Sequence, residues 1–194
     1  MNCIATLNFK VMRVSILLTI LAFSGAVLAQ PNLTPGASQM ESILVVGGTA
    51  HLGTGEFIDN AAIGFEDGII NFVGTAREVD QKRYNRVVDV TGMQIYPGFI
   101  APNSTLGLME VAAVRASRDY QEVGTFKPNV RSVIAYNAAS DITPTVRTNG
   151  VLMGQITPRG GVIGGSSSVV QFDAWNWEDA VIRADDGIHL YWPS

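Results

Sequence analysis

The 194-residue sequence contains one cysteine and only two histidines. The cysteine, Cys3, precedes an apolar segment near the N-terminus, so neither a disulfide within the chain nor a cysteine metal site can form. His51 and His189 are too few to build a cluster of imidazole ligands. Charged residues make up only 15% of the chain, and the net charge is −4. This mildly negative balance argues against nucleic acid or an anionic membrane as a partner.

Apolar residues are abundant instead, and many of them lie near the N-terminus. Met12 and Arg13 are followed by an apolar run over residues 14–23 and then by small residues up to Ala29. This pattern predicts a signal peptide over residues 1–29, cleaved after Ala29. A membrane anchor is the alternative, but the run is shorter than the roughly 18 to 20 residues needed to span a bilayer. We therefore expect an exported protein, periplasmic or secreted, without membrane contact after cleavage.

Two parts of different character follow the leader. Residues 30–41 are polar and rich in Pro and Gly, which predicts a flexible lead-in. Residues 42–96 contain β-branched apolar runs, two of which flank Asp67-Gly68. An Asp-Gly pair between such runs is a strong hairpin signal, because both positions tolerate positive φ. The pattern predicts a small β-domain.

Residues 97–194 alternate between expected helices and strands. A helix closed by Gly150 precedes a strand over 151–157, and a Gly-rich loop over 160–168 leads to a second strand over 168–173. A further helix is expected to begin near Glu178. Such alternation is typical of the start of a (β/α) barrel. A complete barrel needs roughly 200 to 250 residues, so we expect an incomplete barrel with an unpaired sheet edge and low solubility.

The segment Tyr96-Pro97-Gly98-Phe99-Ile100-Ala101-Pro102-Asn103-Ser104-Thr105 resembles the amidohydrolase superfamily. Members of that superfamily enter their first barrel strand through Pro-Gly-[Phe/Leu]-Ile-Asp-x-His-x-His. Ala101 stands at the Asp position, and Asn103 and Thr105 stand at the two His positions. Motifs over residues 107–131 and 145–168 resemble secreted bacterial imidazolonepropionase-like amidohydrolases in which this His pair is typically absent. The resemblance extends from Ser42 to the end of the chain.

The resemblance implies an α/β fold, with a composite β-sandwich over residues 42–96 followed by the first part of a metallo-hydrolase (β/α)₈ barrel over 97–194. It also implies a hydrolase that acts on C–N bonds other than peptide bonds, in a cyclic amide or related small molecule. A divalent, zinc-like metal is the cofactor that the superfamily implies, although Asn103 and Thr105 are weak ligands. As a fragment the chain is expected to be inactive. The alternative is a non-catalytic periplasmic binding or scaffold protein on the same fold.

Three residues are candidates for substrate binding, and no catalytic residue is identified. Asn103 and Thr105 are expected to alternate on one strand and to face the same side. Arg159, at the end of the strand over 151–157, could bind a substrate carboxylate, or it could be a solvated surface residue. His189 is more often structural than functional in such a setting. The expected partner is a small-molecule substrate, and a homo-oligomer stays open because Trp residues favour core packing or subunit contact.

Overall fold

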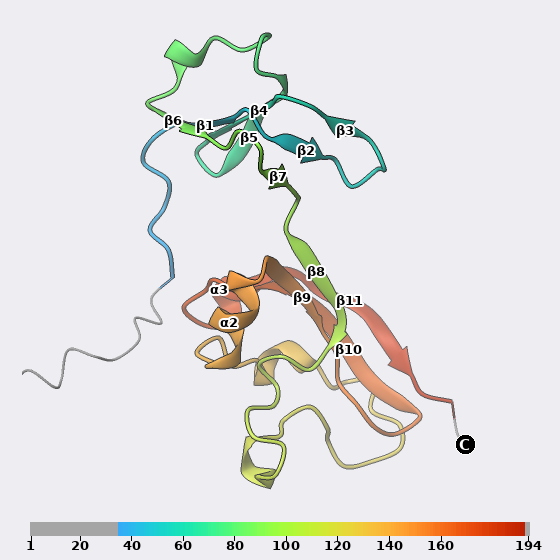
Figure 1. Cartoon of the computed structure of the whole chain (residues 1–194). Helices are drawn as coiled ribbons and strands as arrows, with labels where there is room; N and C mark the ends of the chain where they lie inside the picture. The colour runs from blue at the N-terminus through green and yellow to red at the C-terminus, as the bar shows by residue number, and fades with distance from the viewer. Residues whose placement is uncertain (1–34, 193–194) are drawn as a thin grey trace, which may run out of the picture. The chain divides into compact units, whose positions relative to one another are not determined.

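The computed structural model describes residues 35–192 (Figure 1). The predicted signal peptide over 1–29 and the first residues of the lead-in lie outside this range. The regular secondary structure of these residues is mostly β-strand, with two short α-helices, α2 (Ile142–Thr148) and α3 (Trp177–Ala180), and several 3-10 turns. No helix within 35–192 is long and apolar enough to cross a membrane.

The first half of the described chain forms two small sheets. One sheet has the strand order β5-β4-β1-β6, and the other has the order β3-β2-β7. Strand β1 pairs antiparallel with β4 and parallel with β6. The strands are β1 (Ile43–Val46), β2 (Thr49–His51), β3 (Phe57–Ile58), β4 (Ala61–Glu66), β5 (Ile69–Thr75), β6 (Arg86–Asp89) and β7 (Gln94–Ile95).

The hairpin predicted around Asp67-Gly68 is confirmed. Strands β4 and β5 pair antiparallel across these two residues, whose φ angles are +51° and +74°. Two positive φ angles give the turn a twist that matches the twist of the paired strands. Leu44 and Ala62 are fully buried on the sheet that contains this hairpin, where Phe72 and Tyr84 pack against them.

The second half begins with a parallel strand pair joined through a helix. Strand β8 (Phe99–Ser104) pairs parallel with β9 (Val151–Ile156), and α2 (Ile142–Thr148) precedes β9. The predicted helix and strand are therefore confirmed here. Gly150, between them, has a φ angle of +85°, which glycine adopts without steric cost. One such β-α-β unit is the repeating element of a (β/α) barrel.

The sequence prediction is confirmed only in part for the two strands that follow, because it expects a strand over 168–173 and a helix after it. Strand β10 (Ile163–Gln171) includes the second half of the predicted Gly-rich loop, and Ser166, Ser167 and Ser168 are buried in it. The expected helix near Glu178 is a single turn, α3 (Trp177–Ala180). It gives way to β11 (Val181–Leu190), because β-branched side chains at its start favour a strand. Both new strands run antiparallel to their partners, giving the sheet order β11-β10-β9-β8.

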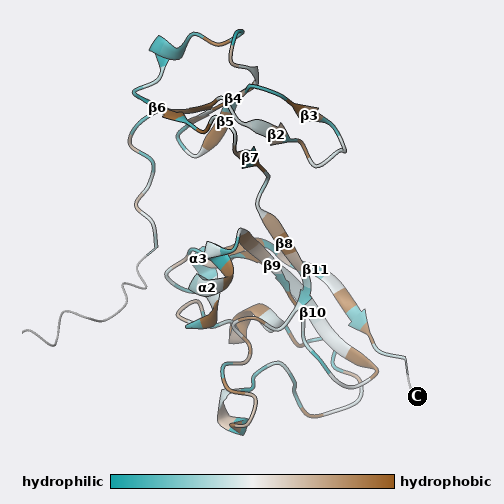
Figure 2. Ribbon diagram, in the orientation of Figure 1, coloured by the Kyte–Doolittle hydropathy of each residue, from teal (hydrophilic) through white to brown (hydrophobic). Residues whose placement is uncertain are grey.

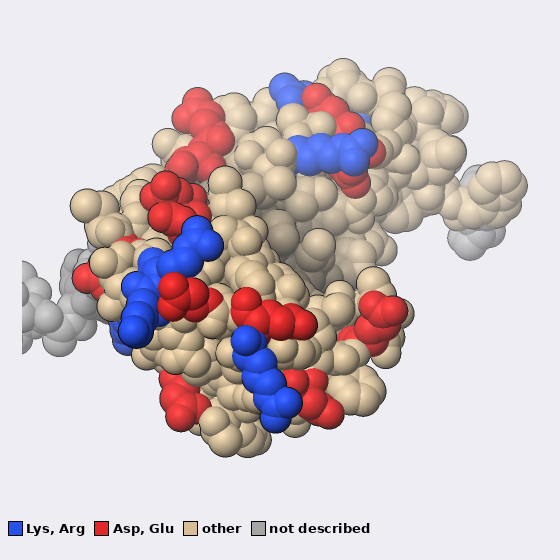
Figure 3. Space-filling view, turned by 90° about the horizontal axis from the view of Figure 1, so that it is seen from above, with Lys and Arg blue, Asp and Glu red and all other residues tan. Residues whose placement is uncertain are grey.

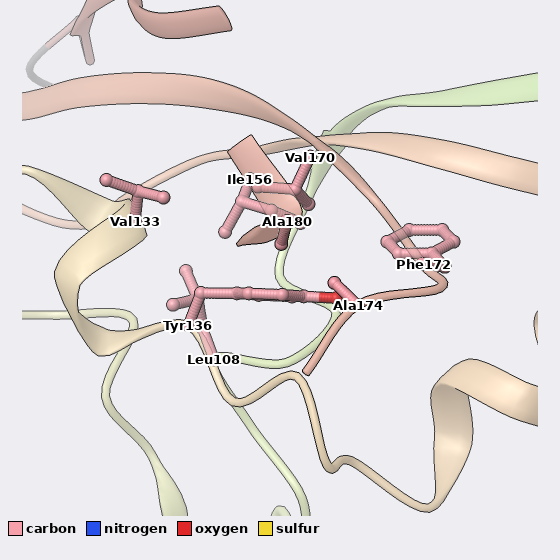
Figure 4. Close-up of a cluster of buried hydrophobic side chains, with 8 residues drawn as sticks. All are labelled: Leu108, Val133, Tyr136, Ile156, Val170, Phe172, Ala174 and Ala180. Atoms are coloured by element: carbon pink, nitrogen blue, oxygen red, sulfur yellow. The ribbon is translucent and has the colours of Figure 1, made fainter. Parts of the chain in front are cut away.

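Figure 4 shows the main hydrophobic core, which lies under this sheet. Ile156 of β9, Val170 of β10 and Val133 are fully buried. The core also contains Leu108, Tyr136, Phe172, Ala174 and Ala180. Ser132 ties the turn that contains Val133 to the sheet, because its Oγ donates to the carbonyl of Ile156 at 2.6 Å. The connection between β8 and β9 thus contributes directly to the core.

Large apolar side chains remain exposed on both edge strands of this sheet. Phe99 and Ile100 on β8 are more than half exposed, as are Ile182, Ile188 and Leu190 on β11. Figure 2 shows these strands with brown, hydrophobic stretches along the ribbon. Edge strands with apolar side chains tend to associate with other chains. The low solubility and the remainder of the barrel both stay predictions.

Candidate functional site

Asn103 and Arg159, two of the three predicted binding residues, are in direct contact. Arg159 Nη1 donates to Asn103 Oδ1 at 2.5 Å, and Arg159 Nη2 donates to the Asn103 carbonyl oxygen at 2.6 Å. Asn103 therefore supplies both acceptors for the Nη1–Nη2 edge of the guanidinium. The pair is 56 residues apart in sequence, and the parallel pairing of β8 with β9 brings the two strand ends together.

A bulge in β8 gives Asn103 its orientation. Ala101 pairs with Gly154 and Ser104 pairs with Ile156, so the intervening β8 residues outnumber those of β9 by one. Asn103 has a φ angle of +52°, in the left-handed region that asparagine tolerates better than most residues. A bulge re-aims side chains and is common beside functional sites. It interrupts the regular alternation expected for Asn103 and Thr105.

Gln155 and Asp186 continue the network behind Asn103. The Asn103 backbone N–H donates to Gln155 Oε1 at 3.2 Å, and Gln155 Nε2 donates to Asp186 Oδ2 at 2.7 Å. The other carboxylate oxygen of Asp186 pairs with Arg183 at 3.2 Å. Gln155 thus joins the edge strand β8 to β11 across the face of the sheet, and it fixes the bulge from behind.

Arg159 itself is held at its backbone and at its side chain. Its N–H donates to the Tyr120 carbonyl at 2.7 Å, and its carbonyl accepts from Lys127 Nζ at 3.3 Å. Lys127 is only 4% exposed and also donates to the Glu122 carbonyl. The hydroxyl of Tyr191 accepts from Arg159 Nη1 at 3.4 Å and donates to the Pro158 carbonyl at 2.5 Å. These contacts fix the position of the guanidinium before any ligand arrives.

His189 lies beside this cluster. Its Nε2 hydrogen-bonds Ser167 Oγ at 2.8 Å, and Ser167 is fully buried. Burial lowers the pKa of His189 below its usual 6.5, the positive charge of Arg159 lowers it further, and Asp186 opposes the shift. The imidazole is therefore neutral at pH 7. Because Ser167 is inaccessible, this Ser–His pair joins β10 to β11 and does not present a nucleophile.

Thr105, the third predicted residue, lies just beyond the end of β8. Its carbonyl accepts from the Leu108 N–H at 3.0 Å, which starts the turn into the long connection. Within residues 35–192 its side chain forms no hydrogen bond to the cluster of Asn103 and Arg159. The structure thus brings together two of the three predicted residues and adds Gln155, Asp186, His189 and Tyr191 around them.

The residues at this position do not fit a divalent metal ion. Both oxygen atoms of Asn103 accept hydrogen bonds from Arg159, and the guanidinium puts a positive charge where a metal would have to approach. In the described range no group of three or more His, Cys, Asp or Glu side chains could hold a metal ion. Neutral oxygen donors beside a fixed cation are a poor set for a zinc-like ion.

Charge elsewhere on the molecule is mixed in sign. Figure 3 shows acidic and basic side chains interspersed on the face in view. Arg131 pairs with Asp185 at 2.8 Å, and Arg147 pairs with Asp173. The Arg131 hydrogen bond holds the pKa of Asp185 below its usual range. In contrast, no carboxylate of residues 35–192 forms an ion pair with Arg159.

Some of these residues could have been found from the sequence. Gln155 is a polar side chain within an otherwise apolar strand, flanked by buried Gly154 and Ile156. A polar residue at such a place, near the carboxyl end of a predicted strand, is a recognisable signal. Asp186 and Tyr191 give no comparable signal, because a helix is expected to begin near Glu178 and no strand is predicted after it.

Part of the chain is similar in sequence to curated bacterial enzymes. Over 49 residues, 25% of this chain, it is 41% identical to an imidazolonepropionase of Bacillus thuringiensis (strain Al Hakam). It is 39% identical over 49 residues to the enzyme of the same name from Bacillus mycoides (strain KBAB4). The matched region spans about 12% of the length of these relatives. No protein-family model matches the sequence.

A solved structure is similar over most of the chain. The crystal structure of an amidohydrolase from Thermotoga maritima MSB8 matches 76% of this chain with a TM-score of 0.68 and 23% sequence identity. The match covers 38% of that protein. At this identity the likeness establishes a shared fold over the matched part of the chain.

Proposed function

The chain is related to the amidohydrolase superfamily over part of its length, and from this premise we propose that it contributes to a hydrolase. The proposed substrate is a small molecule with a C–N bond other than a peptide bond, such as a cyclic amide. This proposal agrees with the name of the Bacillus relatives and with the fold of the Thermotoga structure. We further propose that the protein is exported, in keeping with the leader pattern in the sequence.

The observation that most supports this function is the polar cluster at the carboxyl ends of β8 and β9. Asn103 lies in the bulge near the end of β8, and Arg159 follows the end of β9. In sheets of parallel strands, substrates bind beyond the carboxyl ends of the strands. The cluster is the part of the sheet where polar side chains from three strands, β8, β9 and β11, meet.

The cluster can bind and orient a substrate. A fixed guanidinium stabilises negative charge, and its rigid geometry selects planar groups. Burial and the positive charge of Arg159 both lower the pKa of His189, so its imidazole does not add a second positive charge to the cluster near neutral pH.

The test is hydrolysis by the protein expressed from its complete gene. A panel of cyclic amides is incubated with the wild type and with Arg159→Gln, and ring opening is followed by chromatography. We expect at least one ring to open, and the substitution to reduce kcat/KM by about 100-fold, the loss of a charged contact worth roughly 3 kcal/mol. A folded protein that opens no ring would reject the hydrolase proposal.

A binding protein is the second candidate, and the contact between Asn103 and Arg159 favours it. This contact occupies the position at which the superfamily pattern places its first metal ligands. A binding protein would retain ligands on the cluster without any turnover. Ligand binding together with absent hydrolysis, in the same preparation, would select this candidate.

A further inference from the structure

The guanidinium of Arg159 has one edge with partners and one edge without. Asn103 accepts from Nη1 and Nη2, and Tyr191 accepts from Nη1. Within residues 35–192, Nε–H and the second N–H of Nη2 have no acceptor. These two N–H groups point in the same direction, which is the geometry that receives the two oxygens of a carboxylate.

The charge of Arg159 is also uncompensated. Its partners in the described range are an amide, a carbonyl and a hydroxyl, all neutral. The three ion pairs of this part of the chain involve Arg131, Arg147 and Arg183. A half-buried cation without a counter-ion is stabilised when an anion binds to it.

The position of Arg159 is fixed in advance, which favours ligand binding. Tyr120 and Lys127 hold its backbone, and Asn103 and Tyr191 hold its guanidinium. Tyr191 is itself fixed, because its N–H donates to the Val162 carbonyl at 2.9 Å. Arginine normally loses side-chain freedom when it binds a ligand, and this arrangement removes most of that cost.

We infer that Arg159 binds a carboxylate of the small-molecule ligand through the Nε–Nη2 edge of its guanidinium. The inference rests on the proposed function for the nature of the ligand, and it narrows that ligand to an anion. Asn103 occupies the Nη1–Nη2 edge, so the Nε–Nη2 edge is the one that remains for a ligand. Tyr191 is a positioning residue, since its hydroxyl contacts the guanidinium and its ring lies against Gly164.

The test compares two ligands that differ only in a carboxylate. L-Pyroglutamate is a cyclic amide with one carboxylate, and 2-pyrrolidinone is the same ring without it. Binding to the 194-residue chain is measured by calorimetry, with acetate as the minimal probe. We expect pyroglutamate to bind at least about tenfold more tightly than 2-pyrrolidinone, as one charge-assisted bidentate contact implies.

Substitutions test whether the guanidinium of Arg159 causes the preference for pyroglutamate over 2-pyrrolidinone. Arg159→Gln should abolish it, and Arg159→Lys, which keeps the charge but loses the planar edge, should reduce it severalfold. Tyr191→Phe should weaken pyroglutamate binding about threefold without affecting 2-pyrrolidinone. Arg118→Gln, which removes an exposed arginine of the same half of the chain, is the matched control and should leave the preference intact.

Several results would overturn the inference. Equal affinity for the two rings would show that the carboxylate makes no favourable contact. The anion would bind elsewhere if the preference for pyroglutamate survived Arg159→Gln or was lost in Arg118→Gln. Failure of both acetate and pyroglutamate to bind below about 100 mM would show that the free edge receives no carboxylate. Inorganic phosphate binding more tightly than acetate would contradict the assignment to a carboxylate. The binding test does not need turnover. If the 194-residue chain binds pyroglutamate while the protein from the complete gene opens no ring, the hydrolase proposal fails and the inference stands.

Discussion

Replacing Asn103 by alanine and by glycine separates the two roles of this residue. Asn103 supplies Oδ1 to Arg159 at 2.5 Å, and it holds the bulge with a φ angle of +52°. Both substitutions remove the side-chain acceptor. Alanine keeps a Cβ, which disfavours the left-handed conformation when no polar side chain compensates, whereas glycine has none. We therefore expect the alanine variant to be the less stable of the two.

The structure allows the size of each effect to be worked out. The hydrogen bond to Arg159 involves a charged donor but lies at an exposed position, so its loss costs about 1 kcal/mol. The left-handed conformation costs alanine about 1 kcal/mol more than glycine after allowance for the entropy of glycine. The free energy of unfolding should fall by about 2 kcal/mol for Asn103→Ala and about 1 kcal/mol for Asn103→Gly. The corresponding decreases in Tm are about 4 to 8 °C and about 2 to 4 °C.

Asn60 provides a matched control for the backbone contribution. Its φ angle is +50°, and its side chain forms no hydrogen bond within the described part of the chain. Asn60→Ala should therefore cost about 1 kcal/mol and Asn60→Gly almost nothing. Urea unfolding followed by circular dichroism gives all four values. Equal stability of Asn103→Ala and Asn103→Gly would refute the role assigned to the bulge, and a neutral Asn103→Gly would refute the contact with Arg159.

Three further predictions concern the cluster and the core. The free energy of unfolding should fall slightly as the pH drops through 6.5, because the unfolded chain binds the His189 proton more readily than the folded chain. Unfolding of His189→Gln, followed over the same pH range, should not show this dependence. Ile156→Ala should lower the free energy of unfolding by about 3 kcal/mol, since Ile156 is fully buried, and an effect below about 1 kcal/mol in a urea titration would contradict the core described here. Gly107→Ala should cost at least about 2 kcal/mol, because Gly107 has a φ angle of +71° and a Cβ there would overlap the ring of Tyr136; a Tm equal to that of the wild type would refute this packing.

Local signals in the sequence were sufficient for much of the fold. The Asp67-Gly68 hairpin, the helix before Gly150 and strand β9 each follow from turn residues and β-branched runs. The end of the chain could not be predicted in this way. Asn176 caps the first turn of α3 by accepting from the Asp179 N–H at 2.8 Å, which is a genuine helix-start signal. Pairing of β11 with β10 then outweighs helix formation after Ala180.

The site was predictable only in part. Arg159 was identified by its place after a strand, and Asn103 by the superfamily motif. Their mutual contact depends on the register of β8 against β9, which no local pattern specifies. Pro102 was a missed signal, since proline within a strand is found at edges and bulges. The change of direction at Asn103 follows from that bulge, which interrupts the alternation expected for Asn103 and Thr105.

The central claim is that the Arg159 guanidinium lies at the end of β8, where the superfamily pattern places its first metal ligands. The zinc content of the protein after equilibrium dialysis tests this claim most directly. The 194-residue chain and its Asn103→Ala variant are dialysed against the metal and analysed by mass spectrometry. Because both oxygens of Asn103 accept hydrogen bonds from the Arg159 guanidinium, we predict the same zinc content for both chains. About one zinc ion per wild-type chain, lost in Asn103→Ala, would contradict the account, since it would place a structural or catalytic metal where Arg159 lies.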